Sequence, residues 1–173
     1  MNVDDCINLD DLRVLAKKRV PKLIYDFIEG GSEDESGLVR NEDAFRQRAL
    51  VPRYMVDITA INQDTELFGR TYSSAYGIAP TGGISNYRHQ GDLMLARAAR
   101  DANIPFIMSG AATARMEDMA RECPDHGWYQ LYTAKDRSIS EDQIKRAQEL
   151  GIKTLVITVD VPASGNRERN KRN

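Results

Sequence analysis

Residues 105–159 read PFIMSGAATARMEDMARECPDHGWYQLYTAKDRSISEDQIKRAQELGIKTLVITV. Three apolar runs in this stretch have the composition of β-strands, and they span residues 105–108, 128–131 and 154–159. The last run is apolar and β-branched, which predicts a strand covered on both faces. Two amphipathic segments between the runs, residues 115–123 and 140–150, predict helices. Strands that alternate with helices in this way predict a parallel α/β sheet.

The alternation extends toward the N-terminus, where residues 76–79 predict another strand and residues 90–103 a helix. A capping box of Ser140 and Gln143 predicts the start of the last helix. Residues 50–75 predict a short strand over the alternating positions 51–58, followed by a hairpin turn at Gly69-Arg70.

The first 48 residues predict three helices, over residues 9–20, 21–29 and 33–48. Gly30-Gly31 is expected to end the second helix, because glycine adopts the left-handed conformation at little cost. Residues 165–173 read GNRERNKRN and have no apolar side chain, which predicts an exposed polar tail.

Two fold classes fit a parallel α/β chain, and the first strand–helix turn separates them. A dinucleotide-binding fold needs G-x-G-x-x-G after its first strand, whereas residues 80–85 read PTGGIS. The remaining class is the (β/α)8 TIM barrel, which needs roughly 250 residues and places its sites at the C-terminal ends of the strands. Polar or turn residues lie at or directly after the ends of all four strand candidates: Pro80, Thr81 and Gly82, then Ser109, then Gln130 and Tyr132, then Thr158 and Asp160.

We therefore predict an α/β fold in which only the N-terminal helical segment and about the first four β/α units of a (β/α)8 barrel are present. Residues 1–75 are expected to form the N-terminal helices and a capping hairpin. Residues 76–173 are expected to form the first half of the barrel, which ends in the loop after strand four.

Composition excludes several classes of protein. The chain has 173 residues and a formal net charge of −2, which indicates no nucleic-acid partner. Neither a membrane span nor a signal peptide is recognisable, so a cytoplasmic protein is expected. Cys6 and Cys123 have no metal-binding spacing and are expected to be free thiols, with no metal bound.

Seven segments in order resemble the FMN-dependent α-hydroxy-acid dehydrogenases and oxidases, the family of glycolate oxidase, lactate oxidase and mandelate dehydrogenase. They are residues 25–35 (YDFIEGGSEDE), 41–45, 51–53, 79–82, 91–99, 128–132 (WYQLY) and 158–168 (TVDVPASGNRE). The wording of residues 25–35 and the presence of Gly82 look closest to the mandelate dehydrogenases of that family.

The resemblance implies roles for nine residues. Tyr25 and Arg167 are similar to the residues that hold the substrate carboxylate, and Tyr132 to the tyrosine near the substrate hydroxyl. The turn residues Pro80, Thr81 and Gly82 resemble those that pack beside flavin N5. The residues that hydrogen-bond the flavin ring and ribityl chain are matched by Ser109, Gln130 and Thr158.

The implied reaction is oxidation of a mandelate-like (S)-2-hydroxy acid to the 2-oxo acid, with hydride transfer to N5 of FMN. The family's catalytic histidine and FMN phosphate site are expected beyond residue 173, so the chain alone is expected to be inactive. The partners implied are a small 2-hydroxy acid, the missing C-terminal half and other copies in a tetramer.

Three points stay open at this stage. The alternative function is a catalytically silent half-barrel fragment or assembly module. The electron acceptor is oxygen, a quinone or a cytochrome. Membrane association would depend on a segment that is not present here.

Overall fold

The computed structural model describes residues 2–160 and 163–173. Val161 and Pro162, which belong to the resembling segment 158–168, lie outside the described residues. The chain forms two compact units. Unit 1 contains the described residues up to Val56 together with residues 163–173, and unit 2 is Asp57–Asp160. The sequence predicted a domain boundary at residue 75, and that boundary stays a prediction.

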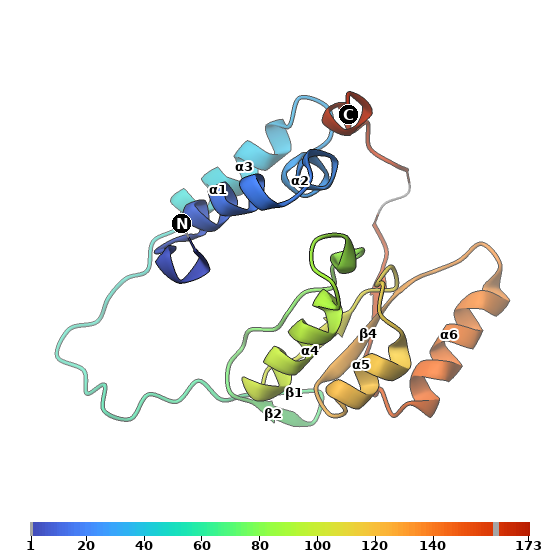
Figure 1. The fold of residues 1–173 in the computed structure, drawn as a ribbon. Helices are drawn as coiled ribbons and strands as arrows, with labels where there is room; N and C mark the ends of the chain where they lie inside the picture. Colours follow the sequence, from blue (N-terminus) through green and yellow to red (C-terminus); the bar gives the residue numbers. More distant parts are fainter. Residues whose placement is uncertain (1, 161–162) are drawn as a thin grey trace. The chain divides into compact units, whose positions relative to one another are not determined.

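Unit 1 is helical, and its elements are η1 (Val3–Asp5), α1 (Leu9–Arg19), α2 (Lys22–Glu29), α3 (Ser36–Arg46) and α7 (Glu168–Lys171) (Figure 1). The three helices predicted before residue 50 are confirmed within a few residues. The start of α1 follows from its sequence, because the Asn8 side chain accepts a hydrogen bond from the Asp11 amide at 2.8 Å.

Two expectations about unit 1 are wrong. Gly30 ends α2 in extended conformation, with φ −85°, and not in the left-handed region. Glycine is required at position 30 for a steric reason, since a Cβ there would lie 2.6 Å from the carbonyl oxygen of Asp26. The polar tail also contains a helix, α7, which packs against α2. Its charged side chains bind partners in unit 1, as Arg169 does with Glu35.

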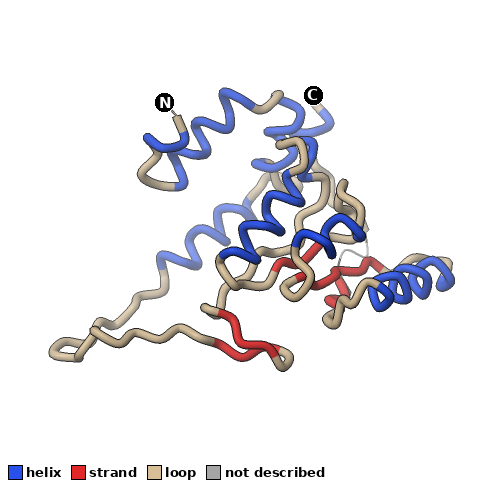
Figure 2. The backbone as a smooth tube through the Cα atoms, turned by 60° about the horizontal axis from the view of Figure 1, so that its bottom comes forward, coloured by secondary structure: helices blue, strands red, loops and turns tan. Residues whose placement is uncertain are grey.

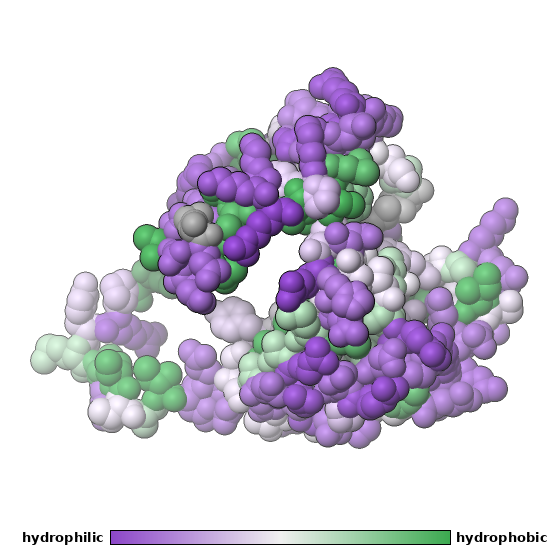
Figure 3. All heavy atoms as spheres, in the orientation of Figure 1, coloured by the Kyte–Doolittle hydropathy of each residue, from purple (hydrophilic) through white to green (hydrophobic). Residues whose placement is uncertain are grey.

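Unit 2 begins with an antiparallel hairpin, β1 (Thr65–Leu67) and β2 (Arg70–Tyr72), whose turn contains Phe68 and Gly69. The hairpin is confirmed, but the strand predicted over residues 51–58 is wrong. Leu50, Val51, Met55 and Ile58 are exposed and lie outside any described helix or strand. In Figure 3 hydrophobic atoms gather on the segment between α3 and β1. The alternating pattern of residues 51–58 therefore lies in a segment that has no strand partner among the described residues.

A three-stranded parallel sheet follows, in the order β3-β4-β5. Its strands are β3 (Phe106–Met108), β4 (Gly127–Tyr132) and β5 (Leu155–Thr158), and the connecting helices are α4 (Gly91–Asp101), α5 (Met116–Glu122) and α6 (Arg137–Glu149), with a short η2 (Ile84–Asn86) before α4 (Figures 1 and 2). The strand predicted at residues 76–79 is reduced to one parallel bridge between Ile78 and Phe106.

Packing in unit 2 corrects two further details. The core lies between β3, β4 and the helices, and it contains Ala96, Phe106, Met119 and Leu131. β5 is not covered on both faces, since Leu155 and Ile157 are exposed. The predicted capping box at Ser140 is also wrong. α6 begins three residues earlier, where Asp136 accepts from the Ser138 amide at 3.0 Å.

None of the helices in the described ranges is long and apolar enough to cross a membrane.

Candidate active site

A network of hydrogen bonds joins the C-terminal ends of the three parallel strands in unit 2. Gln130 on β4 is only 1% exposed, and its Oε1 accepts from Ser109 Oγ at 3.2 Å and from the Gly110 amide at 3.0 Å. Its Nε2 donates to Thr158 Oγ1 at 2.7 Å. Because parallel strands end at one edge of a sheet, Ser109, Gln130 and Thr158 meet where α/β barrels bind their ligands.

The direction of each hydrogen bond in this network follows from one backbone group. The Gly110 amide can only donate, so it fixes the oxygen of the Gln130 side chain toward β3 and the nitrogen toward Thr158. The Ser109 hydroxyl donates to Gln130 and accepts from the Ala111 amide at 3.1 Å. Thr158 accepts from Gln130, which leaves its own hydroxyl proton and the second Nε2 proton of Gln130 as donors at this edge.

Two loops at this edge approach closely because they carry small residues. The Gly83 amide donates to the Ala111 carbonyl at 3.1 Å, and Gly83 has φ +67°. A Cβ at Gly82 would lie 3.0 Å from the Cβ of Ala111, and a Cβ at Gly110 would lie 2.8 Å from the Gln130 carbonyl oxygen. The loop after β3 therefore packs against both the turn at residues 80–83 and β4.

The loop residues Gly110 and Ala111 were not singled out from the sequence. Their signal is a pair of small residues directly after a strand, a pattern too common to be specific. The turn residues Pro80 and Thr81 are exposed beside Gly82.

Tyr132 lies at the end of β4 and is 51% exposed. It is the ladder partner of Thr158 on β5, so the two side chains share the edge that carries the Gln130 network. Unit 2 therefore brings together Ser109, Gln130, Tyr132 and Thr158, with Gly82 on the adjoining loop.

Tyr25 and Arg167 belong to unit 1. Arg167 Nη2 donates to the Gly30 carbonyl at 2.6 Å and to the Phe27 carbonyl, and the guanidinium carbon lies 4.5 Å from the centre of the Phe27 ring. A cation at these carbonyls stabilises the C-terminus of α2. Tyr25 is buried one turn before the end of this helix, and no hydrogen bond between described residues joins it to Arg167. Arg167 Nε is buried and has no partner among the described residues.

Neither histidine lies in the Gln130 network. Burial foremost, and then the charge of Arg70, lower the pKa of His126, whose Nε2 lies 2.9 Å from Arg70 Nη2. His89 is exposed in the turn before α4. The Cys123 thiol is buried, which raises its pKa to about 11, so it is protonated at neutral pH and is a poor nucleophile.

Known proteins share this sequence and geometry. The family model of the FMN-dependent dehydrogenases matches residues 16–173. The (S)-mandelate dehydrogenase of Pseudomonas putida is 42% identical over 166 residues, which are 96% of this chain and 42% of that protein. A peroxisomal (S)-2-hydroxy-acid oxidase of Oryza sativa subsp. indica is 40% identical over 167 residues, 96% of this chain and 46% of the oxidase. The chain thus spans about half the length of these curated relatives.

Solved structures agree with the sequence comparison. A soluble mutant of the membrane-associated (S)-mandelate dehydrogenase from Pseudomonas putida matches with a TM-score of 0.92 at 41% identity, over 98% of this chain and 48% of that one. A mandelate oxidase matches with a TM-score of 0.91 at 34% identity, over 97% and 50%. The chain therefore has the fold of the first part of a (β/α)8 barrel, without a closed barrel in the described residues. It belongs to the family of FMN-dependent dehydrogenases.

Proposed function

We propose that this chain supplies the flavin-ring and substrate-carboxylate parts of an enzyme that oxidises a mandelate-like (S)-2-hydroxy acid to the 2-oxo acid. The observation that carries the proposal is the buried network of Ser109, Gln130 and Thr158 at the C-terminal edge of the sheet. FMN, the cofactor of the family, supplies hydride acceptance at N5 when it is bound.

The donors at this edge fit the flavin ring. An isoalloxazine ring presents carbonyl oxygens and ring nitrogens that accept hydrogen bonds, and the second Nε2 proton of Gln130 and the Thr158 hydroxyl are donors of that kind. Ser109 already donates to Gln130, so its role is to hold the amide and to accept from a flavin N–H with its remaining lone pair. Backbone groups of Pro80, Thr81 and Gly82 would pack beside N5.

Tyr25, Tyr132 and Arg167 are proposed to bind the substrate. The buried, unpartnered Nε of Arg167 is, among the described residues, a donor suited to one carboxylate oxygen, while Nη2 holds the guanidinium against α2. Tyr25 would donate its hydroxyl to the same carboxylate, and Tyr132 would bind near the substrate hydroxyl. A preference for aryl substrates is proposed from the missing methyl group at Gly82.

We also propose that turnover needs a base that these residues do not provide. His126 is buried against Arg70 and Asn103, and His89 lies outside the Gln130 network. Loss of a general base typically lowers a rate by a factor of about 10² to 10⁴. Membrane association, a property of the Pseudomonas putida enzyme, stays a prediction for this protein.

The second candidate function is an assembly module without activity of its own. It is favoured by the exposure of Leu155 and Ile157 on β5 and of Val159 directly after it. Within the described residues, β5 pairs with β4 alone. An unpaired parallel edge of this kind can take a further strand.

The experiment that tests the proposed function is a titration of the chain with FMN, in which binding is measured by the quenching of flavin fluorescence. Q130L removes the amide at nearly constant volume, and Q148L is the matched control on the exposed surface of α6. We expect FMN binding by the unaltered chain and by Q148L, and at least about tenfold weaker binding by Q130L, the size expected when a buried hydrogen-bonding group is lost. Equal FMN affinities of Q130L and the unaltered chain would contradict the site.

A further inference from the structure

Asp92 is a buried carboxylate that the proposed function does not use. It is the second residue of α4 and is 1% exposed. Its Oδ2 accepts a hydrogen bond from the hydroxyl of Thr113 at 2.7 Å. Thr113 lies in the loop between β3 and α5, so this contact joins α4 to the loop that follows Ser109. A buried charge is costly unless it is hydrogen-bonded, which makes the Thr113 contact important to this part of the fold.

The carboxylate fixes the direction of the neighbouring hydrogen bonds. A hydroxyl has one proton, and an ionised carboxylate can only accept, so the Thr113 proton lies toward Asp92. The Thr113 oxygen is then an acceptor for Ser85, whose Oγ is 2.6 Å away and whose amide donates to it at 3.2 Å. Asp92 therefore orients Thr113, and Thr113 accepts both donors of Ser85.

These bonds connect the two loops of the candidate site. Ser85 is in η2, directly after the turn that carries Thr81 and Gly82, and Thr113 follows Gly110 and Ala111. The Gly83–Ala111 backbone hydrogen bond is a second link between the same loops. The intervening loop residues lie outside any helix or strand, so the Asp92–Thr113–Ser85 bonds add side-chain links between the two loops, beside the bond that holds the Gly110 amide to Gln130.

We propose that Asp92 and Thr113 are positioning residues that hold the turn at residues 80–83 against the loop after β3, and thereby shape the flavin edge of the site. The inference rests on the proposed function for its consequence, but the anchoring of the loops can be measured without any ligand.

The first measurement is hydrogen–deuterium exchange of the whole chain. T113V removes the hydroxyl at nearly constant shape, and T113S restores it. T59V is the matched control, because the Thr59 hydroxyl also binds a carboxylate oxygen, that of Asp57 at 2.8 Å, in an exposed position. We expect the Ser85 and Gly83 amides to exchange roughly tenfold faster or more in T113V, the effect of losing a hydrogen bond to a charged group, and to be unchanged in T113S and T59V. Unchanged exchange in T113V would overturn the proposal.

The second measurement is FMN binding by the same variants. We expect T113V to bind FMN about tenfold more weakly than the unaltered chain, with an altered visible spectrum of the bound flavin, and T113S to restore both. If Q130L binds FMN as tightly as the unaltered chain, the proposed function fails while the exchange experiment still decides the anchoring. If T113V opens the loops but binds FMN with unchanged affinity and spectrum, the positioning role is wrong although the anchor is real.

Discussion

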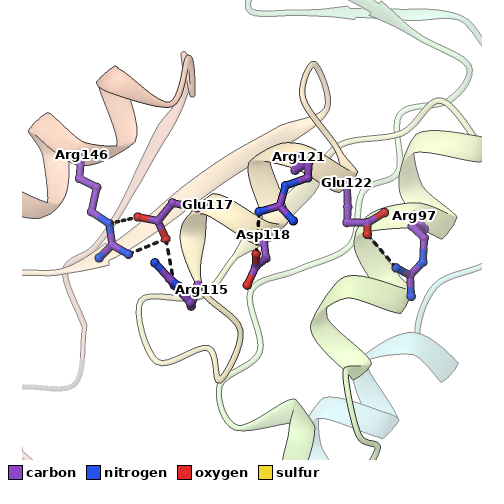
Figure 4. Close-up of polar contacts among 7 residues, drawn as sticks. All are labelled: Arg97, Arg115, Glu117, Asp118, Arg121, Glu122 and Arg146. Atoms are coloured by element: carbon purple, nitrogen blue, oxygen red, sulfur yellow. Dashed lines mark hydrogen bonds and ion pairs between the residues drawn. The ribbon is translucent and has the colours of Figure 1, made fainter.

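Arg146 on α6 binds both carboxylate oxygens of Glu117 on α5, with Nε 2.6 Å from Oε1 and Nη2 2.7 Å from Oε2 (Figure 4). Arg115 approaches the same carboxylate at 3.6 Å. The hydrogen bonds from Arg146 foremost lower the pKa of Glu117 to about 2. The other ion pairs in Figure 4 include Asp118–Arg121, which lies within α5 and joins no second helix.

The Glu117–Arg146 pair predicts a pH-dependent stability. Because the folded-state pKa of Glu117 lies below its ordinary value of 4.5, its contribution is complete above that value and is lost as the pH falls toward about 2. We expect urea unfolding to show E117Q less stable than the unaltered chain at pH 7 and the difference to shrink between pH 4.5 and 2. D118N, which breaks only the pair within α5, should have the smaller effect at pH 7. If E117Q and the unaltered chain differ in stability as much at pH 2 as at pH 7, the Glu117–Arg146 pair is not the cause of the difference.

His126 predicts a second pH dependence, at milder pH. Burial foremost, and then Arg70, lower its pKa from 6.5, so the unfolded chain binds the proton more readily. Stability should therefore fall as the pH decreases through 6.5. We expect the melting temperature to decrease between pH 7.5 and 5.5 in the unaltered chain and in H89Q, and to decrease less in H126Q. An equal decrease in H126Q would show that other groups cause it.

Two glycines predict opposite effects of the same substitution. A Cβ at Gly110 would lie 2.8 Å from the Gln130 carbonyl oxygen, so G110A should destabilise unit 2 by about 1–3 kcal/mol. Gly37 lies inside α3, and a Cβ added there would meet no described atom within 4 Å, so G37A should stabilise unit 1 by about 0.5–1 kcal/mol. Denaturant unfolding of both variants measures the difference. Stabilisation by G110A would mean that the loop after β3 can move away from β4.

Substrate preference should respond to the contact between positions 82 and 111. The Cβ of G82A would lie 3.0 Å from that of Ala111, so the substitution should move the loop after β3 as well as reduce space at the site. In a form of the protein that turns over 2-hydroxy acids, we expect the ratio of kcat/KM for mandelate over lactate to fall roughly tenfold in G82A. The G82A/A111G double variant should recover part of the lost preference for mandelate over lactate. An unchanged ratio in G82A would remove the argument that Gly82 makes room for an aryl group.

The sequence predicted the sheet well where strands are apolar runs between helices. β3 and β4 overlap the runs at residues 105–108 and 128–131, because burial against helices requires such runs. β5 overlaps the run at residues 154–159, although Leu155 and Ile157 are exposed. Residues 51–58 alternate apolar and polar side chains but have no strand partner among the described residues, and residues 76–79 make only one bridge. Pairing depends on neighbours distant in sequence, which a local pattern cannot show.

The candidate site was predictable only in part. Strand-end residues such as Ser109, Gln130 and Thr158 stood out because barrels place their sites there, and the structure joins these three by hydrogen bonds. Asp92 did not stand out, since an acidic residue in the first turn of a helix is usually solvated and favourable for the helix itself. Its importance depends on its burial and on its hydrogen bond to Thr113, and both of these follow from tertiary packing.

The helix α7 has a consequence for biosynthesis. It packs against α2, and Arg169 binds Glu35 across 134 positions of the chain, with the whole of unit 2 between them. A ribosome therefore releases α1, α2 and α3 long before their last partner exists, whereas all the contacts within unit 2 become available earlier than that partner. During synthesis, the described contacts within unit 2 can therefore form before α1, α2 and α3 acquire those that α7 supplies.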